Sequence, residues 1–124
     1  MQPSTSPERA ERCPITDFVT LITGKWATPI LYKLILRNGP VRYSDLLRSL
    51  APITQKELTR HLKQFEGQGL VRRTVHPEMP PKVEYEITEL GKTLKDPFDR
   101  LAVWMLTHGH EVTPARRPDS SANS

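Results

Sequence analysis

The sequence is short of cysteine and contains no long apolar run, and each shortage excludes a class of protein. Its single cysteine, Cys13, cannot form a disulfide within the chain or supply a zinc site made of several cysteines. No segment approaches the ~18 apolar residues that a membrane-spanning helix requires. Residues 1–12 are polar, whereas a secretory signal has an apolar centre. We therefore expect a cytoplasmic protein with no membrane association, no metal site and no cofactor.

The remaining composition describes a small, basic protein of 124 residues, enough for one domain. Hydrophobic residues make up 36% and charged residues 26%, which allows one packed core. Lysine and arginine outnumber aspartate and glutamate by 18 to 14, and the net charge of +4 permits a nucleic-acid partner. Residues 1–12 and 113–124 cannot bury enough apolar surface to become ordered. We predict two disordered tails around one domain at residues 13–112.

Apolar periodicity predicts five helices and two strands. The helices are expected at residues 17–22, 25–36, 43–50, 55–68 and 89–108, and the strands at 71–75 and 83–87. Ser44 is predicted to cap the third helix, Thr54 and Glu57 to form a capping box on the fourth, and Pro97 to kink the last. The order predicts an α+β, mainly α fold of the winged helix-turn-helix type. A generic α+β domain with the same elements is the alternative.

The helix predicted at residues 55–68 has two chemically different faces. At 100° per residue, its apolar side chains share one face, and its three cations, Lys56, Arg60 and Lys63, lie almost opposite. Gln55 and Thr59 flank the cations. Arginine, lysine, glutamine and threonine are the side chains that contact base edges and phosphates in a major groove. An ordinary solvated helix face would have the same composition.

The two predicted strands form a basic hairpin directly after this helix. Their connection, residues 76–82, contains three prolines and should project as a semi-rigid loop. Arg72 and Arg73 lie in the first strand, and His76 and Lys82 bracket the loop. We therefore expect a wing at residues 75–83 that contacts phosphates or the minor groove.

An ordered set of short motifs runs through some three-quarters of the chain. They are Cys13-Pro14, Gly24-Lys25-Trp26, Tyr43-Ser44-Asp45-Leu46, Ile53-Thr54-Gln55-Lys56, Leu58-Thr59, Leu62 to Glu66, Gly69-Leu70-Val71, Pro80-Pro81-Lys82-Val83-Glu84-Tyr85 and Thr88-Glu89-Leu90-Gly91. In this order they resemble the HxlR-type winged helix-turn-helix transcriptional regulators, which are related to the MarR group. Two departures are Thr23, where the family often has a second glycine, and Glu57, which places a carboxylate near the DNA.

The resemblance implies a homodimer that binds pseudo-palindromic double-stranded operator DNA. It implies that the helix at 54–68 enters the major groove, that the proline loop is the wing, and that the first and last helices form the dimer interface. The predicted DNA-contacting residues are Tyr43, Ser44, Thr54, Gln55, Lys56, Thr59, Arg60, Lys63, Arg73, His76 and Lys82. The predicted dimer interface comprises Phe18, Leu94, Phe98, Leu101, Trp104 and Met105. Alternatively, this apolar stripe closes the core of the monomer.

Two kinds of effector are compatible with the sequence. Cys13 matches a cysteine that senses oxidants or electrophiles in some members of the family, and the neighbouring Arg9 and Arg12 would favour its thiolate. The alternative is an inert, partly buried thiol. A small-molecule pocket lined by Phe18, Trp26 and Trp104 is a second candidate, although such residues are more often core.

Other functions fit the sequence less well. The four histidines show no clustering with cysteine or aspartate that suggests a catalytic unit, so we do not expect an enzyme. A winged helix that binds only proteins would not need Lys56, Arg60 and Lys63 on its reading face. We predict a sequence-specific transcriptional regulator, and we expect a repressor rather than an activator.

Overall fold

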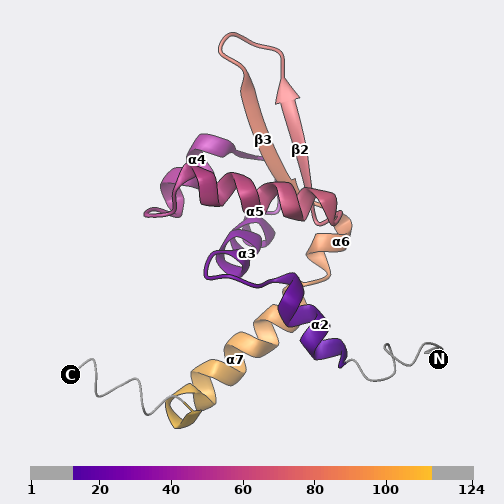
Figure 1. Cartoon of the computed structure of the whole chain (residues 1–124), viewed down its shortest axis with the longest axis vertical. Helices are drawn as coiled ribbons and strands as arrows, with labels where there is room; N and C mark the ends of the chain where they lie inside the picture. Colours follow the sequence, from indigo (N-terminus) through magenta and orange to yellow (C-terminus); the bar gives the residue numbers. More distant parts are fainter. Residues whose placement is uncertain (1–12, 113–124) are drawn as a thin grey trace, which may run out of the picture.

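The computed structural model describes residues 13–112, and both predicted tails lie outside the described residues. Figure 1 shows a hairpin at one end of the molecule, two helices directed away from it at the other end, and a group of helices between them. Among the residues that the structure describes, no helix has the length and apolar character needed to cross a membrane.

The chain forms helices around a small sheet, which confirms the predicted α+β, mainly α class. The elements are α2 (Pro14–Leu21), α3 (Ala27–Arg37), β1 (Val41–Arg42), α4 (Tyr43–Ser49), α5 (Gln55–Gly67), β2 (Val71–His76), β3 (Lys82–Ile87), α6 (Glu89–Lys92) and α7 (Lys95–Val112). The sheet is antiparallel with the order β1-β3-β2.

The core lies between α3, α4, α5 and one face of the sheet. Its fully buried side chains include Leu34, Leu46, Leu58, Leu62 and Phe65, each with 0% exposure. Burying a side chain of this size contributes about 1.5–3 kcal/mol. Three of the five lie on α5, so the apolar face of this helix is fixed against the rest of the domain.

Both ends of α5 are capped by residues that the sequence indicates. The amide of Glu57 donates to the hydroxyl of Thr54 at 3.1 Å, and the amide of Thr54 donates to the carboxylate of Glu57 at 3.1 Å. The predicted capping box is therefore confirmed. At the other end Gly69 has a φ of 78°, and the amide of Leu70 donates to the carbonyl of Phe65 at 2.9 Å.

The prediction of one kinked helix at residues 89–108 is wrong. Two helices, α6 and α7, occupy this stretch, and Pro97 lies in the first turn of α7, where its missing N–H costs no hydrogen bond. Thr88 caps α6, because its hydroxyl accepts from the amide of Gly91 at 3.0 Å. A Cβ at Gly91 would lie 2.5 Å from the carbonyl oxygen of Leu70. α6 therefore packs so closely against the base of the hairpin that a side chain at position 91 would clash.

The cap of α4 also differs from the prediction, although the helix begins at Tyr43 as expected. Ser44 does not cap this helix, because α4 begins at Tyr43 and its N-cap residue, Arg42, provides no side-chain hydrogen bond. The chain enters α4 directly from β1, which pairs with β3 through Val41 opposite Tyr85. A two-residue strand is too short to show an alternating pattern, so β1 was not predicted. Similarly, α2 begins at Pro14 rather than at residue 17, since proline is favoured at the first helical position.

Candidate nucleic-acid interface

The structure brings the largest group of predicted DNA-contacting residues together on the solvent-facing side of α5. Gln55, Lys56, Thr59, Arg60 and Lys63 are all exposed and form what we call the basic face of α5. The apolar side chains of the same helix are fully buried on the other side. The division that helical spacing predicted is therefore present in the structure.

The cations of the basic face differ from most other cations of the domain in their pairing. Lys56, Arg60 and Lys63 form no ion pair with any of residues 13–112. In contrast, Lys95 pairs with Asp99 at 2.6 Å and Arg100 with Asp96 at 3.0 Å. These three cations are thus not engaged in ion pairs with a described residue and are available to an anionic partner.

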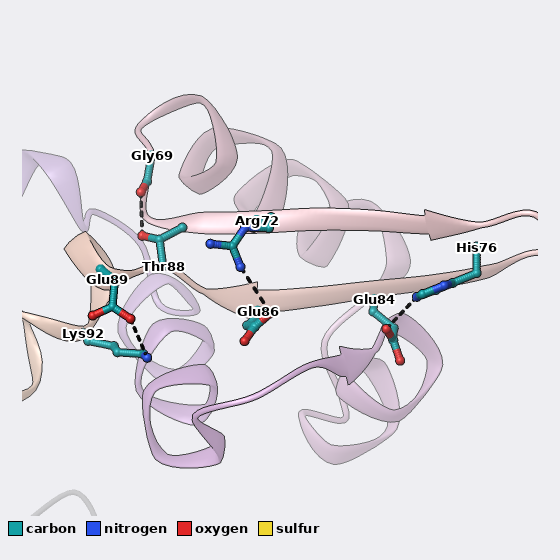
Figure 2. Close-up of polar contacts among 8 residues, drawn as sticks. All are labelled: Gly69, Arg72, His76, Glu84, Glu86, Thr88, Glu89 and Lys92. Atoms are coloured by element: carbon teal, nitrogen blue, oxygen red, sulfur yellow. Dashed lines mark hydrogen bonds and ion pairs between the residues drawn. The ribbon is translucent and has the colours of Figure 1, made fainter.

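Most cations of the hairpin, by contrast, are paired across the strands. Figure 2 shows Arg72 beside Glu86 and His76 beside Glu84, with atom separations of 3.2 and 2.8 Å. Lys82 lies 3.9 Å from Glu84 and 3.8 Å from Glu78. The sequence showed cations at the wing but not these partners, because the pairing depends on the register of β2 and β3.

Arg73 lies on the opposite face of β2 from Arg72 and forms no ion pair with a described residue. Its guanidinium lies beside the hydroxyl of Tyr85. Burial raises the pKa of Tyr85, and the neighbouring guanidinium acts in the opposite direction. Arg73 also lines a hollow together with Thr59 and Lys63 of α5, so this cation lies on the side of the hairpin that faces α5.

Tyr43 connects α4 to α5. Its hydroxyl lies 2.9 Å from the hydroxyl of Thr59 and donates to the carbonyl oxygen of Gln55 at 3.3 Å. Its ring contacts that of Tyr85, with centroids 6.3 Å apart. Tyr43 thus holds both the start of α5 and the base of the hairpin. Ser44 and Thr54 are exposed nearby, and the Thr54 hydroxyl serves the capping box.

The carboxylate of Glu57 is stabilised by its hydrogen bonds in the capping box of α5. Hydrogen bonds from the backbone amide and then the side chain of Thr54 lower the pKa of its carboxyl group. The carboxylate faces the helix N-terminus, where negative charge is favourable. Its position near the basic face is therefore explained by capping.

His61 is a buried residue of α5 that sequence reasoning did not single out. It is 3% exposed, its ring stacks on Phe65, and its Nδ1 atom has no hydrogen-bond partner in the structure. A Cβ at Gly24 would lie 3.3 Å from the His61 ring. The signal available in the sequence was its place, three residues after Leu58, at the edge of the apolar face.

The predicted dimer residues fall into two groups. Phe98 is 6% exposed and contacts the rings of Phe18 and Tyr32 at 6.0 and 6.2 Å, and Leu94 packs against the core. Leu101, Trp104 and Met105 are 54%, 49% and 48% exposed. The first group therefore belongs to the monomer, and the second forms an exposed apolar surface on α7.

The hollow beside α7 is not the predicted aromatic pocket. It measures about 330 Å³ and lies between α3 and α7, lined by residues that include Pro29, Tyr32, Phe98, Leu101 and Met105. Phe18, Trp26 and Trp104 do not line this α3–α7 hollow. The ring of Trp104 instead lies 5.3 Å from that of His108, and the Lys25 ammonium lies 5.3 Å from the ring of Trp26.

Cys13 is exposed and occupies the N-cap position of α2. Hydrogen bonds from the backbone of Thr16 and Ile15 lower the pKa of its thiol. Among the described residues the cause is therefore the N-terminus of α2. Arg9 and Arg12, which are predicted to favour the thiolate, lie outside the described residues. Within residues 13–112, no group of three or more histidine, cysteine or acidic side chains is placed to hold a metal ion.

A turn joins α4 to α5, and α5 lies next to the hairpin of β2 and β3 (Figure 1). The side chains of the basic face of α5 are exposed. This arrangement is the winged helix-turn-helix of DNA-binding transcriptional regulators.

Comparisons with known proteins agree with this class. A family model described as HxlR-like helix-turn-helix matches residues 21–113. An HTH-type transcriptional regulator of Methanothermobacter thermautotrophicus is 40% identical over 97 residues, 78% of this chain and 72% of that protein. A solved structure of a MarR-family regulator from Porphyromonas gingivalis W83 is 30% identical, with a TM-score of 0.70, over 86% of this chain and 97% of that chain. The redox regulator HypR in its reduced form is 34% identical, with a TM-score of 0.70, over 77% and 93%.

The chain belongs to the HxlR-like helix-turn-helix family. The proteins that it matches are transcriptional regulators rather than enzymes, and this chain is a DNA-binding regulator of the same class.

Proposed function

We propose that this chain is a homodimeric repressor in the cytoplasm that binds a pseudo-palindromic operator. The observation that carries the proposal is the basic face of α5, whose three cations have no ion-pair partner in the described part of the chain. Such a face gains free energy from phosphates and guanine edges without first breaking internal ion pairs.

The contacts are assigned by the chemistry of each side chain. Arg60, near the centre of the basic face, donates two hydrogen bonds to a guanine, and Gln55 pairs with an adenine. Lys56 and Lys63 neutralise phosphates at the groove edges. The remaining contacts hold the DNA backbone from α4, the turn and the wing, and they are Tyr43, Ser44, Thr54, Thr59, Arg73, His76 and Lys82.

Dimer formation is assigned to α7 and α2. Both helices point away from α5 in Figure 1, and α7 exposes Leu101, Trp104 and Met105. α2 exposes Ile15 and Val19. Apolar side chains that stay exposed to water do not stabilise a monomer, whereas a two-fold interface would bury them. A dimer of this kind would present two copies of α5 to two half-sites of opposite direction.

Regulation is assigned to Cys13. Its exposed thiol has a lowered pKa and therefore a larger thiolate fraction, which is the nucleophilic form that reacts with oxidants and electrophiles. Two solved relatives support an oxidant as effector: HypR, called a redox regulator, and YodB from Bacillus subtilis, which was also solved after diamide treatment. The alternative is a small apolar effector in the α3–α7 hollow, with Cys13 inert.

Selection of bound duplexes from random DNA, at about 150 mM salt, tests the proposal. Enrichment of an inverted repeat with two similar half-sites is the expected result. Binding without enrichment, together with a steep salt dependence, would show that the chain binds DNA as a polyanion and would overturn the proposed operator. The same selection with Lys56→Ala/Arg60→Ala/Lys63→Ala should enrich no sequence.

A further inference from the structure

A hollow of about 520 Å³ separates α5 from the base of the hairpin. We call it the wing hollow. Its polar lining comes from three parts of the fold and consists of Tyr43, Thr59, Lys63, Glu66, Arg73 and Tyr85. At 100° per residue, Thr59, Lys63 and Glu66 lie on one flank of α5, to the side of Lys56 and Arg60. The wing hollow is therefore at the edge of the basic face and not at its centre.

Two cations line the wing hollow, and neither has an anionic partner. Lys63 comes from α5 and Arg73 from β2, and no ion pair joins either of them to a residue in the described part of the chain. Arg73 is held beside the hydroxyl of Tyr85. Two unpaired cations on separate elements repel each other weakly, and an anion between them would relieve this repulsion.

Hydroxyl groups complete the lining. The hydroxyls of Tyr43 and Thr59 lie 2.9 Å apart, and with Tyr43 as the donor of that bond the Thr59 hydroxyl retains its own proton for another acceptor. A hydroxyl donor beside two cations is a frequent arrangement around a phosphate oxygen. Glu66 is the opposing group, because its carboxylate lines the same space and is itself without an ion pair among the described residues.

We propose that the wing hollow holds one DNA backbone phosphate, bound by Lys63 and Arg73 and by the hydroxyl of Thr59, which Tyr43 positions. The inference rests on the proposed function, since it requires α5 to lie in a major groove. In that position the flank of the helix meets the phosphates that border the groove. Because its ligands come from both α5 and β2, the phosphate fixes the wing relative to the reading helix.

Arg72 provides a matched control for Arg73. The two arginines are consecutive in β2 but lie on opposite faces, and Arg72 is already paired with Glu86 at 3.2 Å (Figure 2). Arg72→Ala and Arg73→Ala therefore remove the same charge from the same strand. Only the second change removes a cation from the wing hollow.

The test uses the duplex enriched by the selection described above, with its phosphates replaced one at a time by neutral methylphosphonates. For the wild-type protein we expect the replacement to weaken binding at several positions in each half-site, and about tenfold at the one whose phosphate lies in the wing hollow. Arg73→Ala should bind the unmodified duplex about tenfold more weakly and lose nothing further at that position. The slope of its binding constant against salt concentration should decrease by the amount expected for about one phosphate contact per half-site. Arg72→Ala should behave like the wild type in all three measurements.

Two further variants separate the phosphate contact from a loss of folding. Arg73→Lys retains a cation and should retain sensitivity at the same phosphate. Glu66→Gln removes the opposing charge and should tighten binding. If Arg73→Ala and the methylphosphonate weaken binding additively at every position, or if Glu66→Gln weakens binding, the phosphate site is overturned. If the wild type enriches no duplex, the proposed operator fails, and the phosphate site fails with it.

Discussion

The hydroxyl of Tyr32 donates a 2.6 Å hydrogen bond to Oδ1 of Asp99 and so joins α3 to α7. The ammonium of Lys95 donates to the other carboxylate oxygen, also at 2.6 Å. The bond from Tyr32, together with the rings of Phe18 and Tyr32 against Phe98, sets the direction in which α7 leaves the domain, whereas the Lys95 bond lies within α7. In a dimer formed through α7, that direction determines the separation of the two α5 helices.

Replacing Tyr32 by phenylalanine should therefore loosen the link between α7 and the reading helix. We expect a stability loss of about 0.5–1.5 kcal/mol, the usual contribution of one hydrogen bond. We also expect a broader tolerance of half-site spacing, because α7 is less firmly oriented. Urea titration and binding to duplexes with one base pair added or removed between half-sites measure these effects. An unchanged spacing preference would show that Phe98 packing alone orients α7.

Arg60→Ala should weaken operator binding by about 1–3 kcal/mol and relax base preference at one position in each half-site. The reason is that the side chain is exposed, unpaired and central on the basic face. Repeating the duplex selection with the variant measures both effects. Arg100→Ala is the control, since Arg100 is paired with Asp96 on α7. Equal losses in the two variants would show that net charge, not position, determines binding.

Leu101→Glu should convert dimers to monomers, because it places a charge in the exposed apolar surface of α7. Light scattering at several protein concentrations measures the mass. Leu36→Glu is a matched control, since Leu36 is 58% exposed on α3, away from α7. Persistent dimers in the α7 variant, or monomers in both variants, would place the interface elsewhere.

Cys13→Ser should abolish any change in operator binding after diamide treatment. The wild-type thiol should also react with iodoacetamide at a lower pH than a free cysteine, since its pKa is lowered by the α2 backbone. Electrophoretic mobility shift with and without diamide measures the first effect. A response that survives the substitution would assign regulation to another group, such as the α3–α7 hollow.

Acid should destabilise the domain through His61. Burial lowers the pKa of this imidazole, and the nearby Arg60 acts in the same direction, while Glu57 opposes both. The unfolded chain therefore binds a proton that the folded chain excludes, and stability falls as pH drops below about 6.5. His61→Phe should flatten this dependence between about pH 5 and 7 in urea titrations. A slope that is the same in both proteins would assign the effect to other groups.

The recognition helix could be predicted closely because its signals are local. Thr54, Glu57 and Gly69 mark its ends within the sequence itself, and spacing alone separates its two faces. The close packing of α6 against the base of the hairpin could not be predicted, because it depends on the contact of Gly91 with Leu70 and Ile87. The ion-pair partners of Arg72 and His76 could not be predicted either, because they become neighbours only when β2 and β3 pair.

The predicted dimer interface on α7 likewise shows that the sequence does not reveal tertiary contacts. Leu94, Phe98, Leu101 and Met105 share a helical face, yet the structure buries Phe98, partly buries Leu94 and exposes the last two. Periodicity identifies the face of a helix but not the point along it where the domain ends.

The opposite orientation of Arg72 and Arg73 restricts how the wing can change in length. Successive residues of a strand alternate between its faces, so one inserted residue before Arg72 would exchange the environments of the two arginines. Insertions of two residues, or changes within the proline loop at 77–81, preserve the alternation. Variation among wings of this type should therefore concentrate at the tip, while the strands below it gain or lose residues in pairs.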